Sequence, residues 1–231
     1  ARPELAAGDL LGLWAWSEAE VLRRTEGPAI RRIGHGGPPR KLDPRTLSDN
    51  WNYSESPERY PIDTGRMRDV IEAAAKGARW GRKLPKGHGL GLAVAYSFMS
   101  YTATVIEVAV DAKGELKVVA VDMAIDCGPQ INPERIRAQM EGGAVMGLSL
   151  ALSGEISFDQ GRVVQSNFFD FTVLRHAESP RTIRTHLVNN NHEVPPGGVG
   201  EPPVPPVAPA LFNAIFAATG KRIRQLPLRD Q

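Results

Sequence analysis

The stretch that most constrains this chain lies at residues 195–206, which read PPGGVGEPPVPP. Glycine allows positive φ and close approach to another group, whereas proline fixes φ and carries no N–H donor. A loop of this composition has a defined shape but makes few hydrogen bonds of its own. Its one carboxylate, Glu201, could thus be held in low-dielectric surroundings, where a raised pKa makes it a useful base. The alternative is a surface connector whose glutamate is solvated.

Composition sets broad limits on the class of protein. Of 231 residues, 42% are hydrophobic and 23% charged, which is typical of globular domains, and the length predicts one or two of them. The net charge of +2 gives no reason to expect nucleic acid or an anionic membrane as partner. No apolar run reaches 18 residues, so we expect no membrane span. A single cysteine, Cys127, excludes an intrachain disulfide and leaves the compartment open between a bacterial-type cytoplasm and periplasm.

The first half of the chain becomes interpretable from residue 66. Residues 66–80 are predicted to form a helix with one apolar face that ends near Gly81. Residues 93–97 and 103–110 are predicted strands. A turn at residues 111–114 and a return strand at 116–125 complete a β-hairpin.

A long helix is predicted next, from Asn132 to about residue 152. Asn132 suits the N-cap and Pro133 the first helical position. Every fourth residue from Ile136 to Leu148 is apolar, which gives one buried stripe. Glycines at 142, 143 and 147 each cost roughly 1 kcal/mol relative to alanine. Their presence indicates that another backbone or a bulky ligand comes close to this helix.

The remaining elements complete an α+β fold. Residues 155–165 are predicted to form a second hairpin, 182–188 a strand, and 209–219 a last helix capped by Gly220. We interpret the aromatic cluster at 168, 169 and 171 mainly as core or channel wall. The predicted architecture is a set of mixed-sheet hairpins packed with the glycine-rich helix and the C-terminal helix.

Several common sites are not supported by the sequence. Residues 87–91, GHGLG, precede a strand, whereas a dinucleotide fingerprint follows one and opens a helix. The five histidines form no zinc-site spacing, and no G-x-S-x-G hydrolase motif occurs. Cys127 has no CxxC partner, so it is predicted to be a packing residue.

Two strings in the chain resemble one known family. Two regions are similar to the C-terminal part of the molybdenum-binding subunit of molybdenum hydroxylases. One is GVGEPPVPP with the following APALFNAIFAATGKRI, and the other is IDCGPQINP together with RAQMEGG. This is the xanthine dehydrogenase and aldehyde oxidase family, and the likeness is greatest to its isoquinoline 1-oxidoreductase β-subunit type. The resemblance covers roughly residues 66–228.

The resemblance implies a set of site residues. The glutamate of the GVGEP loop is the catalytic base in this family, and it corresponds to Glu201. The glutamine of the Q-x-E-G-G helix, which corresponds to Gln139, lies at the cofactor. The metal is held by the pterin dithiolene, so no metal ligand is expected from the chain. The implied cofactor-binding residues are Gln139, Gly142, Gly198, Val199 and Gly200.

The resemblance also implies cofactors, partners and a domain layout. Residues 66–231 would be the C-terminal part of a molybdenum-cofactor-binding domain, and residues 1–65 an N-terminal extension. The cofactor would be molybdopterin or its cytosine dinucleotide, with iron–sulfur clusters on a [2Fe-2S] partner subunit. The remaining N-terminal portion of the molybdenum subunit would be another chain. The reaction would be oxidative hydroxylation of an N-heterocycle or aldehyde with water as oxygen source.

Two other functions remain open at this point. The chain could be a non-catalytic scaffold or assembly subunit of the same fold. It could also be a hydrolase that uses Glu201 with water, although the sequence places no second carboxylate for that role.

Overall fold

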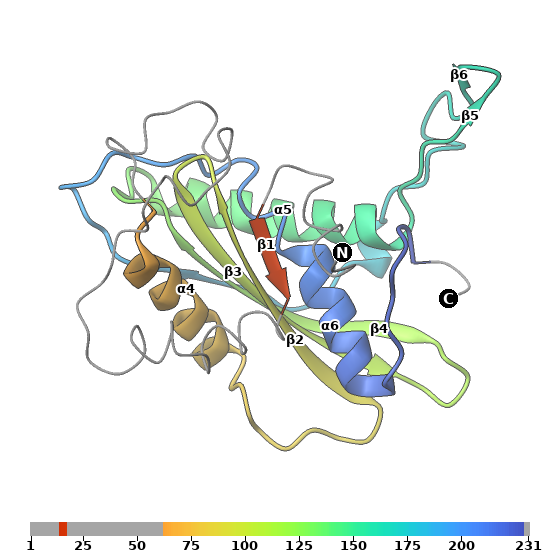
Figure 1. The fold of residues 1–231 in the computed structure, drawn as a ribbon, viewed down its shortest axis with the longest axis horizontal. Helices are drawn as coiled ribbons and strands as arrows, with labels where there is room; N and C mark the ends of the chain where they lie inside the picture. Colours follow the sequence, from red (N-terminus) through yellow and green to blue (C-terminus); the bar gives the residue numbers. More distant parts are fainter. Residues whose placement is uncertain (1–13, 18–61, 229–231) are drawn as a thin grey trace, which may run out of the picture.

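A five-stranded mixed sheet forms the centre of the molecule (Figure 1). The computed structural model describes residues 14–17 and 62–228. Within these ranges the strand order is β1-β2-β3-β4-β7, antiparallel throughout except for the parallel pair β4 and β7. The predicted α+β class with a mixed sheet is confirmed. The strands are β1 (Trp14–Ser17), β2 (His88–Ser97), β3 (Ser100–Val110), β4 (Leu116–Asp126) and β7 (Ile183–Leu187).

Both faces of the sheet are buried, and β3 shows why. Side chains alternate between the two faces of a strand. Tyr101, Ala103 and Val105 pack into one hydrophobic cluster, and Ile106 and Val108 into another. Helices cover both sides of the strand, so its apolar side chains are buried on each face, and Ser100, Thr102 and Thr104 are buried as well.

Helix α4 (Thr64–Gly77) covers one face of the sheet. The Asp63 side chain caps it by accepting hydrogen bonds from the backbone N–H groups of Gly65 and Arg66, at 2.8 and 3.3 Å. This cap starts the helix two residues before the predicted 66–80 range. The helix also ends three residues before the predicted end.

Helix α6 (Val207–Thr219) covers the opposite face. Gly89 and Gly91 of β2 lie directly beneath it, and a Cβ on either would overlap the α6 carbonyls of Ala214 and Ala210. The glycines of the GHGLG string therefore let a helix backbone approach a strand. Gly220 ends α6 with φ of 75°, as predicted for a left-handed C-cap.

Helix α5 (Pro133–Leu152) connects β4 to the parallel strand β7 and packs beside α6. The Asn132 Oδ1 atom accepts from the Arg135 N–H at 3.1 Å, which confirms the predicted N-cap. The predicted stripe is buried at all four positions, Ile136, Met140, Ala144 and Leu148.

A hairpin arm projects from the end of α5 (Figure 1). It contains β5 (Phe158–Asp159) and β6 (Arg162–Val163), and the short 3₁₀ helix η2 (His176–Glu178) follows. Phe168 and Phe169 are 66% and 83% exposed, so they do not lie in the core of this chain, and the channel wall stays a prediction. The arm carries them away from both faces of the sheet. No helix among the described residues is both long and apolar enough to span a membrane.

Candidate functional site

The two strings singled out in the sequence meet in space. A Cβ on Gly200 would lie 3.4 Å from the Gln139 Nε2 atom of α5. Along the same helix, Gly143 contacts the Pro203 ring, and a Cβ on Gly147 would lie 2.5 Å from Val207 Cβ. The close approach predicted for the helix glycines therefore occurs at two of them. The nearest neighbours are side chains, those of Pro203 in the loop and Val207 at the start of α6, rather than a backbone or a ligand.

Beyond this contact, the side of α5 next to Glu201 is open. Gln139, Gly142, Gly200 and Glu201 are all exposed, and a Cβ on Gly142 would meet nothing within 4 Å. No hydrogen bond of the Gln139 amide occurs within residues 14–17 and 62–228. An amide offers both donors and an acceptor, and the bare backbone at Gly142 leaves room beside it. This arrangement fits the polar edge of a pterin.

The low-dielectric setting expected for Glu201 is not present in the chain itself, because its side chain is exposed. The prolines around it are nevertheless buried, namely Pro202, Pro203, Pro205 and Pro206. The loop therefore fixes the backbone of Glu201 against the protein while the carboxylate points outward.

Gly198 and Val199 face inward rather than toward the open side of α5. A Cβ on Gly198 would lie 2.7 Å from the Phe98 Cβ atom, and Val199 packs against the core cluster that contains α5 and α6. In this chain the two residues pack the loop against Phe98 and the hydrophobic core. Their part in cofactor binding stays a prediction.

The loop is held by groups that the sequence did not indicate. The Gly197 N–H donates to Cys127 O at 2.9 Å, and the Gly198 N–H donates to Phe98 O at 2.8 Å. Ser100 and Thr102 of β3 donate their hydroxyls to loop carbonyls. Each contact joins residues about 70 to 100 apart in sequence, so no local pattern could reveal it. Cys127 is 2% exposed, which confirms it as a packing residue, and burial raises the pKa of its thiol.

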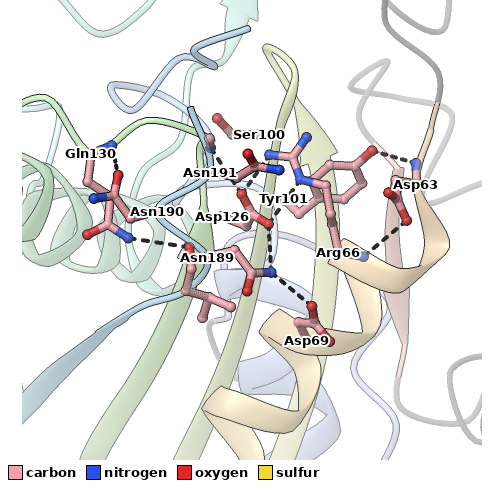
Figure 2. Close-up of polar contacts among 12 residues, drawn as sticks. Asp63, Arg66, Asp69, Ser100, Tyr101, Asp126, Gln130, Asn189, Asn190 and Asn191 are labelled. Carbon is pink, nitrogen blue, oxygen red and sulfur yellow. Dashed lines mark hydrogen bonds and ion pairs between the residues drawn. The ribbon is translucent and has the colours of Figure 1, made fainter. Parts of the chain in front are cut away.

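A buried carboxylate, that of Asp126, accepts hydrogen bonds from α4 and from the segment that leads to this loop (Figure 2). Asp126, at the end of β4, is fully buried and accepts two hydrogen bonds from Arg66 of α4, at 2.6 and 2.9 Å. The Arg66 guanidinium stacks 4.7 Å from the centre of the Tyr101 ring. The Tyr101 hydroxyl accepts from the Asp63 N–H at 2.7 Å, and burial raises the pKa of Tyr101 to about 12. These contacts tie α4 to the end of the sheet.

The same carboxylate fixes the start of the segment that leads to Glu201. Asn189 has φ of 50° and donates its side-chain N–H groups to Asp126 at 3.1 Å and to Asp69 at 2.8 Å (Figure 2). Asn190 accepts from the Gln130 N–H at 2.8 Å. The run of three asparagines at 189–191 was a missed signal, because asparagine tolerates the left-handed region and bonds to nearby backbone.

The described residues contain no group of three or more histidine, cysteine, aspartate or glutamate side chains placed to hold a metal ion.

Comparison with known proteins places these features in a family. The family described as molybdopterin cofactor-binding domain matches residues 62–180. A nicotinate dehydrogenase subunit of Pseudomonas putida is 32% identical over 204 residues, or 87% of this chain. The β-subunit of isoquinoline 1-oxidoreductase from Brevundimonas diminuta is 34% identical over 164 residues, or 69% of the chain. The chain spans 16% and 21% of the length of these two relatives.

Among solved structures, the aldehyde oxidoreductase of Desulfovibrio gigas aligns with a TM-score of 0.48 and 30% identity, over 55% of this chain and 14% of that one. The family match contains the RAQMEGG string, and the relatives agree with the resemblance. The chain belongs to the molybdopterin cofactor-binding domain family of the molybdenum hydroxylases.

Proposed function

We propose that this chain is the C-terminal portion of the catalytic molybdenum subunit of an oxidoreductase. The reaction is oxidative hydroxylation of an N-heterocycle or an aldehyde, with water as the source of oxygen. Residues 66–231 form most of this part of the cofactor-binding domain, and β1 (Trp14–Ser17), from the segment before them, adds an edge strand to its sheet. Two relatives support the chemistry, since their names describe dehydrogenation of nicotinate and oxidation of isoquinoline.

The observation that carries the proposal is the proximity of Gly200 to Gln139, since a Cβ on Gly200 would lie 3.4 Å from the Gln139 Nε2 atom. These residues are 61 positions apart, yet the fold sets the Glu201 loop beside the exposed amide of α5. A base and an amide with free hydrogen-bonding groups then share one open surface. This surface can receive a flat polar cofactor on one side and a substrate on the other.

Each group on this surface has a role that its chemistry suits. Gln139 hydrogen-bonds to the cofactor edge, and the backbone at Gly142 and Gly200 allows close approach. Glu201 accepts a proton from the attacking oxygen of water. When bound, the molybdenum cofactor supplies the two-electron oxidation and lowers the pKa of water at the metal.

The proposal includes partners that complete the site. The cofactor is molybdopterin or its cytosine dinucleotide, and the remaining N-terminal portion of the molybdenum subunit covers its other side. Electrons leave through iron–sulfur clusters on a [2Fe-2S] subunit. The names of the two relatives describe them as subunits, which supports a complex of several chains. Glu201, exposed in this chain, becomes enclosed on assembly, and enclosure favours the proton-accepting role.

The test is Glu201→Gln in the assembled complex. This change keeps the size of the side chain and removes the base. We expect molybdenum content to stay near one per complex while turnover falls about 10²-fold or more. The matched control is Glu193→Gln, which alters an exposed carboxylate eight residues upstream on the same segment. Turnover of the Glu201 variant close to that of the Glu193 variant would reject Glu201 as the base.

Metal analysis of the native complex separates the enzyme from a scaffold or assembly subunit of the same fold. About one molybdenum per complex is expected for the enzyme. A complex that is free of molybdenum and lacks turnover would favour the scaffold.

A further inference from the structure

The proline-rich loop has too few donors to hold itself in place. Pro202, Pro203, Pro205 and Pro206 have no N–H, so this stretch cannot join a sheet ladder. Its backbone carbonyls remain as acceptors, and a buried carbonyl needs a donor. The Val204 N–H donates to Glu201 O at 2.9 Å within the loop, but the carbonyls of Gly198 and Pro202 depend on donors from another element.

Two hydroxyls of β3 hold the carbonyls on either side of Glu201. Ser100 Oγ donates to Gly198 O at 2.6 Å, and Thr102 Oγ1 donates to Pro202 O at 2.8 Å. Both side chains are fully buried. Residues two apart on a strand lie on one face at a fixed spacing of about 7 Å. The two bonds therefore fix both ends of the segment 198–202 on a rigid strand.

The neighbouring turn strengthens the first of these attachments. Phe98 and Met99 connect β2 to β3 with φ of 49° and 61°, a conformation that bulky side chains rarely adopt. This turn aims Phe98 O at the Gly198 N–H. Met99 O lies 2.9 Å from the position that a Cβ on Gly197 would take. A strained backbone persists only where contacts with the surrounding structure hold it in place. Such residues are common beside functional sites.

We propose that Ser100 and Thr102 are positioning residues for Glu201. They hold the carbonyls of Gly198 and Pro202, and so fix the backbone that carries Glu201 next to Gly200 and Gln139. This role rests on the proposed function of Glu201 as the base. The reacting groups must keep a set geometry for proton transfer, so a displaced loop lowers the rate without changing the chemistry of the base.

The strand also supplies a matched control. Thr104 lies two residues beyond Thr102 on the same face and is likewise fully buried. Its Oγ1 has no hydrogen-bond partner in the described part of the chain. Thr104→Val therefore removes a threonine hydroxyl from the same strand without breaking a hydrogen bond, whereas Thr102→Val breaks the hydrogen bond to Pro202 O.

The experiment compares Thr102→Val, Thr102→Ser and Thr104→Val in the assembled complex. Hydrogen exchange of the peptide 197–204 and steady-state kinetics are both measured. In Thr102→Val we expect exchange of the loop amides to accelerate about tenfold, and kcat to fall about tenfold with KM nearly unchanged. Thr102→Ser, which keeps the hydroxyl, should restore both values. Thr104→Val should match the unmodified complex.

Two results would overturn this inference. One is loop exchange in Thr102→Val equal to that in Thr104→Val. The other is faster exchange with an unchanged kcat. Neither result depends on Glu201→Gln, whose retained turnover would instead remove the proposed base. The two proposals can therefore fail separately.

Discussion

At the scale of single residues, Asp122 shows how a buried charge stabilises the parallel strand pair. Asp122 of β4 is 2% exposed and accepts two hydrogen bonds from Arg184 of β7, at 2.7 and 2.5 Å. Its Oδ1 atom also lies 3.0 Å from His186 Nε2. Burial alone would raise the pKa of Asp122, but the bonds from His186 and Arg184 outweigh it and lower that pKa below 3.8.

This carboxylate predicts a pH dependence of stability. Because the pKa is lower in the folded state, the unfolded state binds more protons in acid. The stabilisation is therefore complete well above pH 3.8 and is lost as the pH falls through the lower folded value. Asp122→Asn should lower the free energy of unfolding by about 1–3 kcal/mol at pH 7. Its difference from the wild type should shrink toward pH 3.

Denaturant unfolding of both proteins at pH 7, 5 and 3 measures this difference. Asp159→Asn is the control, since that side chain is exposed on the hairpin arm. If the free energies of unfolding of Asp122→Asn and the wild type differ by the same amount at pH 7 and pH 3, the lowered pKa of Asp122 does not stabilise the fold.

At the scale of elements, α5 carries adjacent glycines with opposite roles. Gly143 is buried and faces the Pro203 ring, whereas Gly142 is exposed with open space beside it. The two positions share helix propensity and neighbours in sequence. Only the direction of the missing side chain differs, since one residue of helix turns it by about 100°.

Alanine at each glycine separates packing from cofactor contact. Gly143→Ala should destabilise the chain by about 1–3 kcal/mol, because the rigid proline ring cannot yield to a new methyl group. Gly142→Ala should gain up to about 1 kcal/mol from helix propensity. If Gly142 contacts the cofactor as proposed, the same variant should purify with less molybdenum. Thermal unfolding and metal analysis of both variants provide the measurements. Full molybdenum loading of a stable Gly142→Ala complex would exclude that contact.

At the scale of the whole molecule, α5 is apolar on two sides. One stripe is buried against the sheet and α6, yet Met146 and Leu150 on the outer side are 55% and 40% exposed. Phe168 and Phe169, which follow β6 in the chain, are exposed as well. Large apolar side chains that are exposed together commonly mark a surface that binds a partner. The proposed remaining portion of the molybdenum subunit is this partner.

A charge on the outer side of α5 should therefore weaken assembly. Met146→Glu is expected to reduce co-purification of this chain with the rest of the molybdenum subunit. The free energy of unfolding of the chain should change by no more than about 0.5 kcal/mol, because the side chain is exposed. Lys113→Glu, on the exposed turn between β3 and β4, is the control. Unchanged co-purification of Met146→Glu would place the partner elsewhere.

Sequence patterns predicted most elements, because caps, turns and periodicity are local. Asn132 and Gly220 marked the start of α5 and the end of α6. The helix glycines were expected to admit a close neighbour, and Gly143 and Gly147 do so. The core alternative failed for Phe168 and Phe169, because an apolar side chain has the same pattern in a core and on a surface.

The sequence by itself determined the helices, the hairpins and the shape of the glycine–proline loop, since these follow from backbone freedom and short-range hydrogen bonds. Only the tertiary structure decided that this loop lies against Gln139 and is held by Ser100 and Thr102. Those contacts join residues far apart in the chain. The prolines have no N–H donors, so apart from the bond between the Val204 N–H and Glu201 O the loop takes its side-chain donors from a distant strand.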